Sequence, residues 1–117
     1  MDYDLIIIGA GWAGFNAALK GRKLGLKVAL IEKDKIGGTC LNYGCIPTKS
    51  LIQSAKIYSL IKKSSAFGIS SNPLLLNFGQ IQAYKDKIIE QLQQGMRSQL
   101  GGIDFLEGES SILSPDT

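Results

Sequence analysis

The fold is decided by residues 4–14, which read DLIIIGAGWAG. This stretch opens with a short aliphatic run, as in a strand that is buried on both faces of a parallel sheet. The run ends in three glycines spaced as GxGxxG, which are Gly9, Gly11 and Gly14. The stretch therefore predicts a buried strand followed by a tight turn that glycine makes possible.

A helix and a second strand are expected to follow the turn. Residues 13–24 are rich in alanine, with apolar residues on one side and Lys and Arg on the other, which predicts a helix. Gly25 ends this helix, and residues 27–32 form a second apolar run that closes with Glu32. A strand, a helix and a strand within about thirty residues are typical of a βαβ unit.

The three glycines and Glu32 have the chemistry of a dinucleotide site. Gly9 would permit the tight turn, Gly11 would let a pyrophosphate approach the backbone, and Gly14 would let the helix pack closely on the strand. The helix start would offer free N–H groups to the phosphates, and Glu32 would accept hydrogen bonds from ribose hydroxyls. Turn and packing glycines of a generic α/β domain are the alternative, and the motif alone does not distinguish NAD from FAD.

The rest of the chain alternates further helices with a third strand. The pattern predicts a loop over 33–39, a helix over 47–63, turns over 64–73, a long helix from Asn77 to the glycines at 101–102, and a strand over 104–107. No assignment is made for 74–76, and 110–117 begin a further element. The apolar stripe of the long helix is expected to pack on the sheet as core. Three strands alternating with helices predict an α/β fold, a Rossmann-like parallel sheet with flanking helices.

Composition describes one ordinary domain. The 117 residues are 44% apolar and 20% charged, and the net charge of +3 is too small to favour a nucleic-acid partner. The aliphatic run near the start is too short to span a bilayer, and we expect no membrane segment and a cytoplasmic location. Histidine is absent, so an imidazole general base would have to come from outside this chain.

Both cysteines lie in residues 37–49, which read GGTCLNYGCIPTK. Two thiols without a histidine cannot supply the four ligands of a zinc site, which argues against a metal. In an ideal helix, Cα atoms five positions apart would be about 8.6 Å apart, beyond the roughly 7 Å that a disulfide spans. The segment must therefore distort if Cys40 and Cys45 are to bond. Gly44 and Pro47 beside the pair favour such a bend.

The surroundings of the cysteines favour a redox role. A helix start and Lys49 would both stabilise a thiolate at Cys45. A dithiol beside a dinucleotide site would form one electron-transfer route, so we favour a catalytic disulfide. Two reduced, buried cysteines of a cytosolic protein are the alternative, because free Cys is commonly a core residue.

The glycine motif, Glu32 and the 37–49 segment together resemble the N-terminal part of the pyridine nucleotide disulfide oxidoreductases. The resemblance covers essentially the whole chain. Within the family, the wording CLNxGCIPTK is most similar to dihydrolipoyl dehydrogenases, while mercuric and glutathione reductases share the cysteine frame. The resemblance implies that residues 1–117 are the N-terminal part of an FAD-binding domain, and that NAD binds a later domain.

The resemblance also implies roles for individual residues. The glycine motif would face the FAD pyrophosphate, Glu32 its adenosine ribose, and Ser110 its adenine. Cys40 would exchange disulfides with a dithiol substrate, and Cys45 would be the thiolate in charge transfer with the flavin. The complete FAD set would be Gly9, Gly11, Gly14, Glu32, Lys33, Gly38, Thr39, Cys40, Gly44, Cys45, Lys49 and Ser110.

The complete enzyme that the resemblance implies would oxidise dihydrolipoyl groups of an acyltransferase partner as a homodimer. Electrons would pass through Cys40 and Cys45 to FAD and then to NAD. Its general base would be a histidine of the other subunit, so this chain alone is expected to be inactive. A non-enzymatic dinucleotide-binding module is the competing interpretation from another class of protein.

Overall fold

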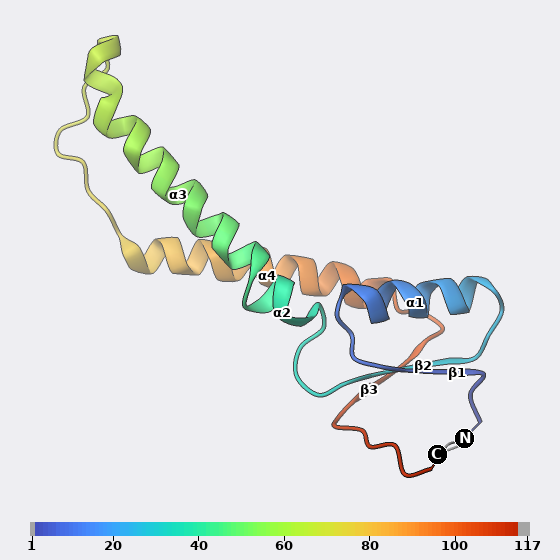
Figure 1. Ribbon diagram of the computed structural model, residues 1–117. Helices are drawn as coiled ribbons and strands as arrows, with labels where there is room; N and C mark the ends of the chain where they lie inside the picture. The colour runs from blue at the N-terminus through green and yellow to red at the C-terminus, as the bar shows by residue number, and fades with distance from the viewer. Residues whose placement is uncertain (1, 115–117) are drawn as a thin grey trace.

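The computed structural model of the protein describes residues 2–114 (Figure 1). In chain order its elements are β1 (Leu5–Ile8), α1 (Trp12–Lys23), β2 (Val28–Glu32), α2 (Gly38–Asn42), α3 (Cys45–Lys63), the 3-10 turn η1 (Ser64–Phe67), α4 (Phe78–Ser98) and β3 (Asp104–Glu107). The strands alternate with helices, as the sequence pattern predicts.

The three strands form one parallel sheet in the order β1-β2-β3. Because the strands are parallel, their carboxyl ends share one edge of the sheet. The glycine turn leaves β1 at this edge, Glu32 ends β2 and Glu107 ends β3. The predicted α/β fold with a parallel sheet is therefore confirmed. Ligands of open parallel sheets bind outside the carboxyl ends of the strands, so we expect a binding site at this edge.

The core lies between the sheet and the helices that cover one of its faces (Figure 1). α1 supplies Phe15 and Ala18, and the central strand β2 supplies Leu30, which is fully buried. The end of α4 adds Met96, and Leu100 follows just beyond it. These side chains fix α1, and with it the glycine turn at its start, against the sheet.

The other face of the sheet is open within residues 2–114. Ile6 and Ile8 are 56% and 57% exposed, whereas Leu5 and Ile7 pack against the core. The prediction that the first strand is buried on both faces is therefore wrong for this structure. The physical reason is that α1 and the end of α4 cover the same face, so alternate side chains of β1 meet no second layer in the described part of the chain.

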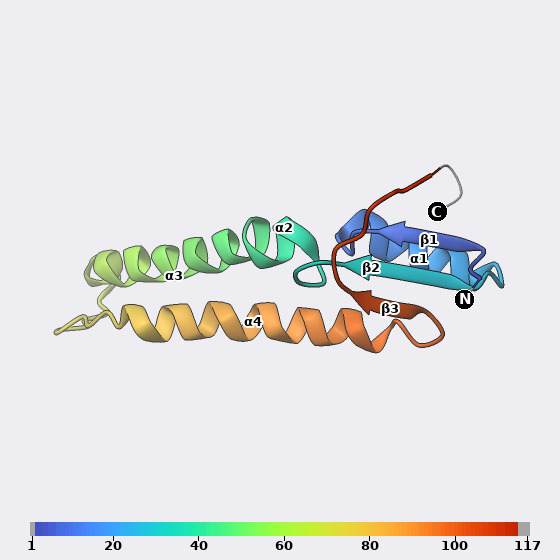
Figure 2. The same cartoon turned by 90° about the horizontal axis from the view of Figure 1, so that it is seen from below.

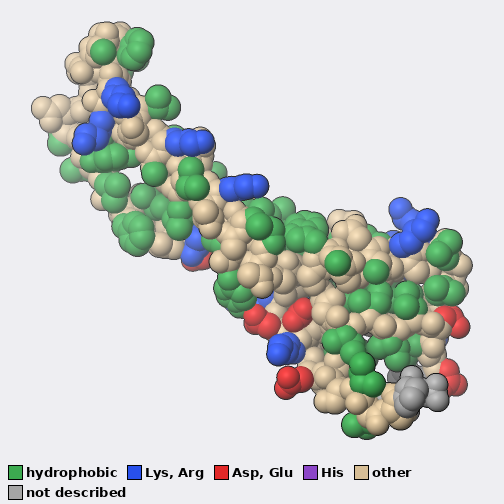
Figure 3. All heavy atoms as spheres, viewed as in Figure 1, with side chains coloured by type: hydrophobic (Ala, Val, Ile, Leu, Met, Phe, Trp, Pro, Cys, Tyr) green, Lys and Arg blue, Asp and Glu red, His purple; other side chains and the backbone are tan. Residues whose placement is uncertain are grey.

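Two long helices, α3 and α4, lie side by side and extend well beyond the sheet (Figures 1 and 2). The molecule is consequently elongated, with principal extents of 67 × 27 × 17 Å. The prediction that the apolar stripe of α4 packs on the sheet is wrong for most of its length. Met96 is buried, but Tyr84 is 57% exposed, because α4 extends beyond the sheet and contacts α3 there (Figure 2). Figure 3 shows basic side chains spaced along α3 with hydrophobic ones between them.

Several boundaries differ from the sequence pattern. α3 begins at Cys45, two residues earlier than predicted, and the short helix α2 was not expected within the loop and cysteine segment. The side chain of Asn77 accepts a hydrogen bond from the Gln80 N–H at 3.0 Å, which confirms the predicted N-cap. Residues 109–114 form neither helix nor strand, and 115–117 lie outside the described residues.

Across residues 2–114, none of the helices is both long and apolar enough to cross a membrane.

Candidate functional site

The glycine turn joins β1 to α1 at the carboxyl edge of the sheet. Gly9 has φ of +98°, a conformation that side chains rarely adopt, and its N–H donates to the Ile31 carbonyl at 2.7 Å. A Cβ at Gly14 would overlap the carbonyl of Gly9, so only glycine lets the helix start this close to the strand. At Gly11 a Cβ would meet only the Gly38 Cα, at 3.9 Å. The backbone at Gly11 is therefore open to approach from outside.

A second glycine pair lies directly against this turn. The Gly37 N–H donates to the Ala10 carbonyl at 2.8 Å, and Gly11 and Gly37 form an isolated parallel bridge. Gly38 has φ of +61°, and a Cβ there would come within 2.9 Å of the Gly11 Cα. Thr39 follows in the first turn of α2 and is exposed. The two glycine motifs, far apart in the sequence, thus form one continuous backbone surface.

Glu32 stands beside this surface and holds it with its carboxylate. One carboxylate oxygen accepts the Ala10 N–H at 2.7 Å, and the other accepts the Asp34 N–H at 2.9 Å. A pocket of about 210 Å³ opens next to it at the carboxyl edge of the sheet. The pocket is lined by residues from all three strand ends, including Gly9, Ile31, Glu32, Lys33, Gly108 and Ser110. Four of the predicted cofactor residues therefore meet at one concave place.

The two cysteines are joined by a disulfide. Cys40 lies in α2 and Cys45 is the first residue of α3, and their Cα atoms are 4.7 Å apart. The backbone bends at Gly44, whose φ of −126° and ψ of −104° are not helical. A Cβ at Gly44 would lie 3.2 Å from the Thr39 carbonyl oxygen, so the bend is tight. The predicted distortion between the cysteines is therefore present, and the alternative of two free cysteines does not hold in this structure.

The disulfide lies at the start of a helix and is accessible. Cys45 is exposed and Cys40 is half-buried. α3 runs for 19 residues behind Cys45, so its dipole favours a negative charge on that sulfur. Lys49 is exposed one turn along the same helix. After reduction, the thiolate of Cys45 would therefore be stabilised more than that of Cys40.

Tyr43, between the two cysteines, donates its hydroxyl to Asp34 at 2.7 Å. That hydrogen bond raises the pKa of Tyr43, with smaller contributions from desolvation and from the Asp34 charge. This exposed hydrogen bond links the loop after β2 to the disulfide segment.

Two apolar anchors fix the disulfide segment to the core. Ile36 precedes the second glycine pair and Leu41 follows it, and they are 1% and 0% exposed. A Cβ at Gly37 would overlap the Leu41 side chain, so the backbone lies directly on this anchor. We expect Leu41→Ala to lower the free energy of unfolding by about 2–5 kcal/mol, because it leaves a cavity under the segment.

Urea unfolding followed by circular dichroism measures this loss of stability. Leu60→Ala is the matched control, since Leu60 is 68% exposed on α3 and its truncation should change stability by less than about 0.5 kcal/mol. Equal effects of the two substitutions would contradict the anchoring role of Leu41.

Some site residues were not singled out from the sequence. Ala10 and Gly37 act through their backbone, and Asn42 through a buried amide, and none of these roles leaves a mark in a residue-type pattern. For Gly37 the residue type itself is a signal, because glycine freely adopts the positive φ that this position has. Among residues 2–114 no group of three or more His, Cys, Asp or Glu side chains could hold a metal ion.

A disulfide beside a glycine-rich turn at the carboxyl edge of a parallel sheet defines a class of redox protein. The family described as pyridine nucleotide-disulphide oxidoreductase matches residues 3–117. The chain belongs to this family.

The curated relatives include two kinds of enzyme. The dihydrolipoyl dehydrogenase of Bacillus subtilis (strain 168) is 40% identical over 116 residues, which are 97% of this chain and 24% of the relative. The dihydrolipoyl dehydrogenase of Acholeplasma laidlawii is 42% identical over 97% of this chain and 34% of its own length. The mercuric reductase of Staphylococcus aureus is 35% identical over 99% of this chain and 22% of its own length. The chain thus spans between about a fifth and a third of these relatives.

Proposed function

We propose that residues 1–117 are the N-terminal part of an FAD-binding domain that carries a redox-active disulfide. The observation that supports the proposal is the backbone contact between the glycine turn and the Gly37–Gly38 pair, which lies two residues before Cys40. We propose that these two glycine motifs form the cradle of a dinucleotide. This arrangement couples ligand binding to thiol chemistry within a single continuous surface. A generic α/β domain has no need of that coupling.

The residues present fit the adenosine and pyrophosphate part of FAD. The open approach at Gly11 accepts a pyrophosphate, and the free N–H groups at the start of α1 complement its charge. The pocket beside Glu32 has room for the adenosine end, with Lys33 at its rim and Ser110 on its wall. Glu32 keeps further lone pairs for ribose hydroxyls, and a 2′-phosphate would be repelled by its charge.

The flavin end belongs on the disulfide side of the cradle. Gly38, Thr39, Gly44 and Lys49 are proposed to line it, together with Cys45, which is an exposed residue. When bound, FAD supplies a two-electron acceptor.

The chemistry of the disulfide is thiol exchange with a dithiol. A substrate thiolate attacks the sulfur of Cys40, the Cys40–Cys45 bond breaks, and the electron pair leaves on the sulfur of Cys45. The second substrate thiol, once deprotonated, displaces Cys40 from the mixed disulfide and closes the substrate disulfide. Two electrons pass from the substrate to the cysteine pair, while one substrate proton ends on Cys40 and the other goes to solvent because Cys45 stays a thiolate. The helix start of α3 holds the charge that appears on Cys45.

The complete protein is proposed to be a cytoplasmic, homodimeric dihydrolipoyl dehydrogenase that passes electrons to NAD. The relatives of that name support this assignment, and lipoyl groups of an acyltransferase complex would be its dithiol substrate. A mercuric reductase-type protein is the second candidate, favoured by the relative of that name. The chain alone is proposed to be inactive in catalytic turnover, because it has no histidine to act as the general base. A single exchange at its disulfide does not require turnover.

The test is an absorbance spectrum of the purified chain after incubation with FAD and removal of free ligand. We expect a retained flavin band, and new long-wavelength absorbance after a dithiol is added. The new absorbance should vanish in Cys45→Ser while the flavin band stays. Gly11→Val, which fills the open approach at the cradle, should lower flavin retention at least about tenfold. Flavin retention that is the same in wild type and Gly11→Val would contradict the proposed cradle.

A further inference from the structure

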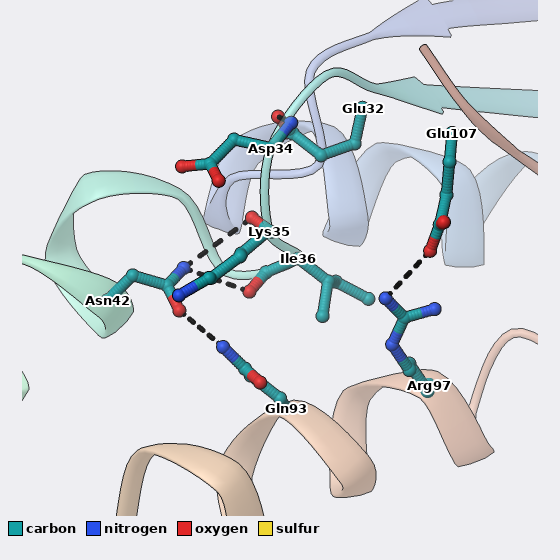
Figure 4. A network of polar contacts seen from close by, with 8 residues as sticks. All are labelled: Glu32, Asp34, Lys35, Ile36, Asn42, Gln93, Arg97 and Glu107. Carbon is teal, nitrogen blue, oxygen red and sulfur yellow. Dashed lines mark hydrogen bonds and ion pairs between the residues drawn. The ribbon is translucent and has the colours of Figure 1, made fainter. Parts of the chain in front are cut away.

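One polar side chain is buried between the two cysteines. Asn42 is 8% exposed at the end of α2. Its amide nitrogen donates to the Ile36 carbonyl at 3.1 Å, with a longer contact to that of Lys35 at 3.5 Å (Figure 4). It also donates to the Gly38 carbonyl at 2.9 Å. These carbonyls belong to the segment in which Gly37 and Gly38 contact the glycine turn at Gly11. The amide therefore holds that loop closed around the start of α2.

The oxygen of the same amide is held from α4. Gln93, half-buried on α4, donates its amide to the Asn42 oxygen at 2.5 Å (Figure 4). One turn further along α4, Arg97 pairs with Glu107 of β3 at 2.9 Å and lies over the Phe105 ring. α4 thus contacts the disulfide segment at one turn and the sheet at the next.

The network reaches the cysteines through a short length of backbone. Cys40 lies two residues before Asn42 in α2, and Cys45 lies three residues after it. A buried amide that loses its partners leaves carbonyls unsatisfied, which costs more than a hydrogen bond contributes. Loosening this network would therefore loosen the element that carries Cys40 while Cys45 stays fixed at the start of α3.

We propose that Asn42, held by Gln93, is a positioning residue that sets how readily the cysteine pair forms its disulfide. The proposal rests on the redox role proposed above. Two thiols form a disulfide more favourably when the fold keeps them close, because their effective concentration is higher. Release of the Asn42 amide lowers that effective concentration and shifts the equilibrium toward the dithiol.

The experiment equilibrates the chain with defined ratios of reduced and oxidised dithiothreitol. In this exchange the reagent dithiol gives two electrons and two protons to the protein disulfide and becomes a cyclic disulfide. Alkylation of free thiols followed by mass spectrometry gives the reduced fraction. Gln93→Ala should shift the equilibrium constant toward the reduced protein about threefold, as expected for one hydrogen bond. Asn42→Ala should shift it about tenfold, because several contacts are lost.

Gln94→Ala is the matched control, since Gln94 is the exposed neighbour of Gln93 on the same helix. Its equilibrium constant should stay within twofold of wild type. Adding Gln93→Ala to Asn42→Ala should produce no further shift, because the contact is already gone. A purely structural contribution of Gln93 elsewhere would instead add to the effect of Asn42→Ala.

The outcomes separate this inference from the proposed function. A wild-type disulfide that dithiothreitol does not reduce in the folded chain would contradict the redox role itself. A wild-type disulfide that is reduced, with Gln93→Ala indistinguishable from Gln94→Ala, would overturn the positioning role alone. Gln93 is only half-buried, so its variant keeps the test valid even where Asn42→Ala fails to fold.

Discussion

Replacing Cys45 with Ser is expected to abolish dithiol oxidation by this chain. The wild-type chain should oxidise one equivalent of dithiol, because its single disulfide accepts two electrons. The variant has no disulfide and should oxidise none. After the protein is removed by filtration under argon, titration of the dithiol left in the filtrate with a thiol reagent measures the difference.

Thr48→Ser is the control for this substitution. Thr48 is exposed in the first turn of α3, close to Cys45, and its change leaves both sulfurs in place. The control should therefore oxidise one equivalent, as the wild type does. Dithiol oxidation that persists in Cys45→Ser would contradict the assignment, and so would a wild-type chain that is folded and oxidises none.

Gly14→Ala should lower the free energy of unfolding of the chain. A Cβ at this position overlaps the carbonyl oxygen of Gly9 and lies 3.2 Å from a methyl group of Ile7, and backbone cannot move aside as a flexible side chain can. Overpacking of this kind costs roughly 1–3 kcal/mol and more where backbone must shift, so we expect a loss of about 3 kcal/mol. Thermal or urea unfolding of the purified variants measures it.

Gly95→Ala is the opposite case of the same substitution. Gly95 lies within α4, and a Cβ there has nothing within 4 Å. Alanine is the better helix former and restricts the unfolded chain, so this variant should gain about 0.5–1 kcal/mol. The pair separates steric overlap from the general effect of replacing glycine. Equal changes in both variants would show that the approach of α1 to β1 is not what requires Gly14.

The sequence pattern was sufficient for the parts of the fold that local chemistry determines. The aliphatic run and the glycine spacing predict β1, the turn and α1, because a buried strand and a tight turn require those residue types. The bend between Cys40 and Cys45 was also predictable, since the helical spacing is too long for a disulfide and Gly44 offers a way to shorten it. The same pattern predicts the pocket residue Glu32.

The remaining features depend on which surfaces meet, and the residue pattern does not state that. The apolar stripe on α4 could pack on a sheet or on another helix, and in the structure α4 contacts α3 beyond the sheet (Figure 2). Ile6 has the composition of a buried residue, yet the described chain offers no second layer to cover it. The network around Asn42 joins residues 51 positions apart, so no local motif could indicate its partner Gln93.

The contact between the two glycine motifs is made by main chain alone, through the Gly37 N–H, the Ala10 carbonyl and the bridge to Gly11. These contacts use peptide groups, so they do not themselves require a particular side chain at the positions that make them. Substitutions of exposed side chains near the disulfide can therefore change the local charge while these backbone contacts stay in place. The chain thus combines a backbone contact between its two glycine motifs with exposed side chains around the disulfide that can vary.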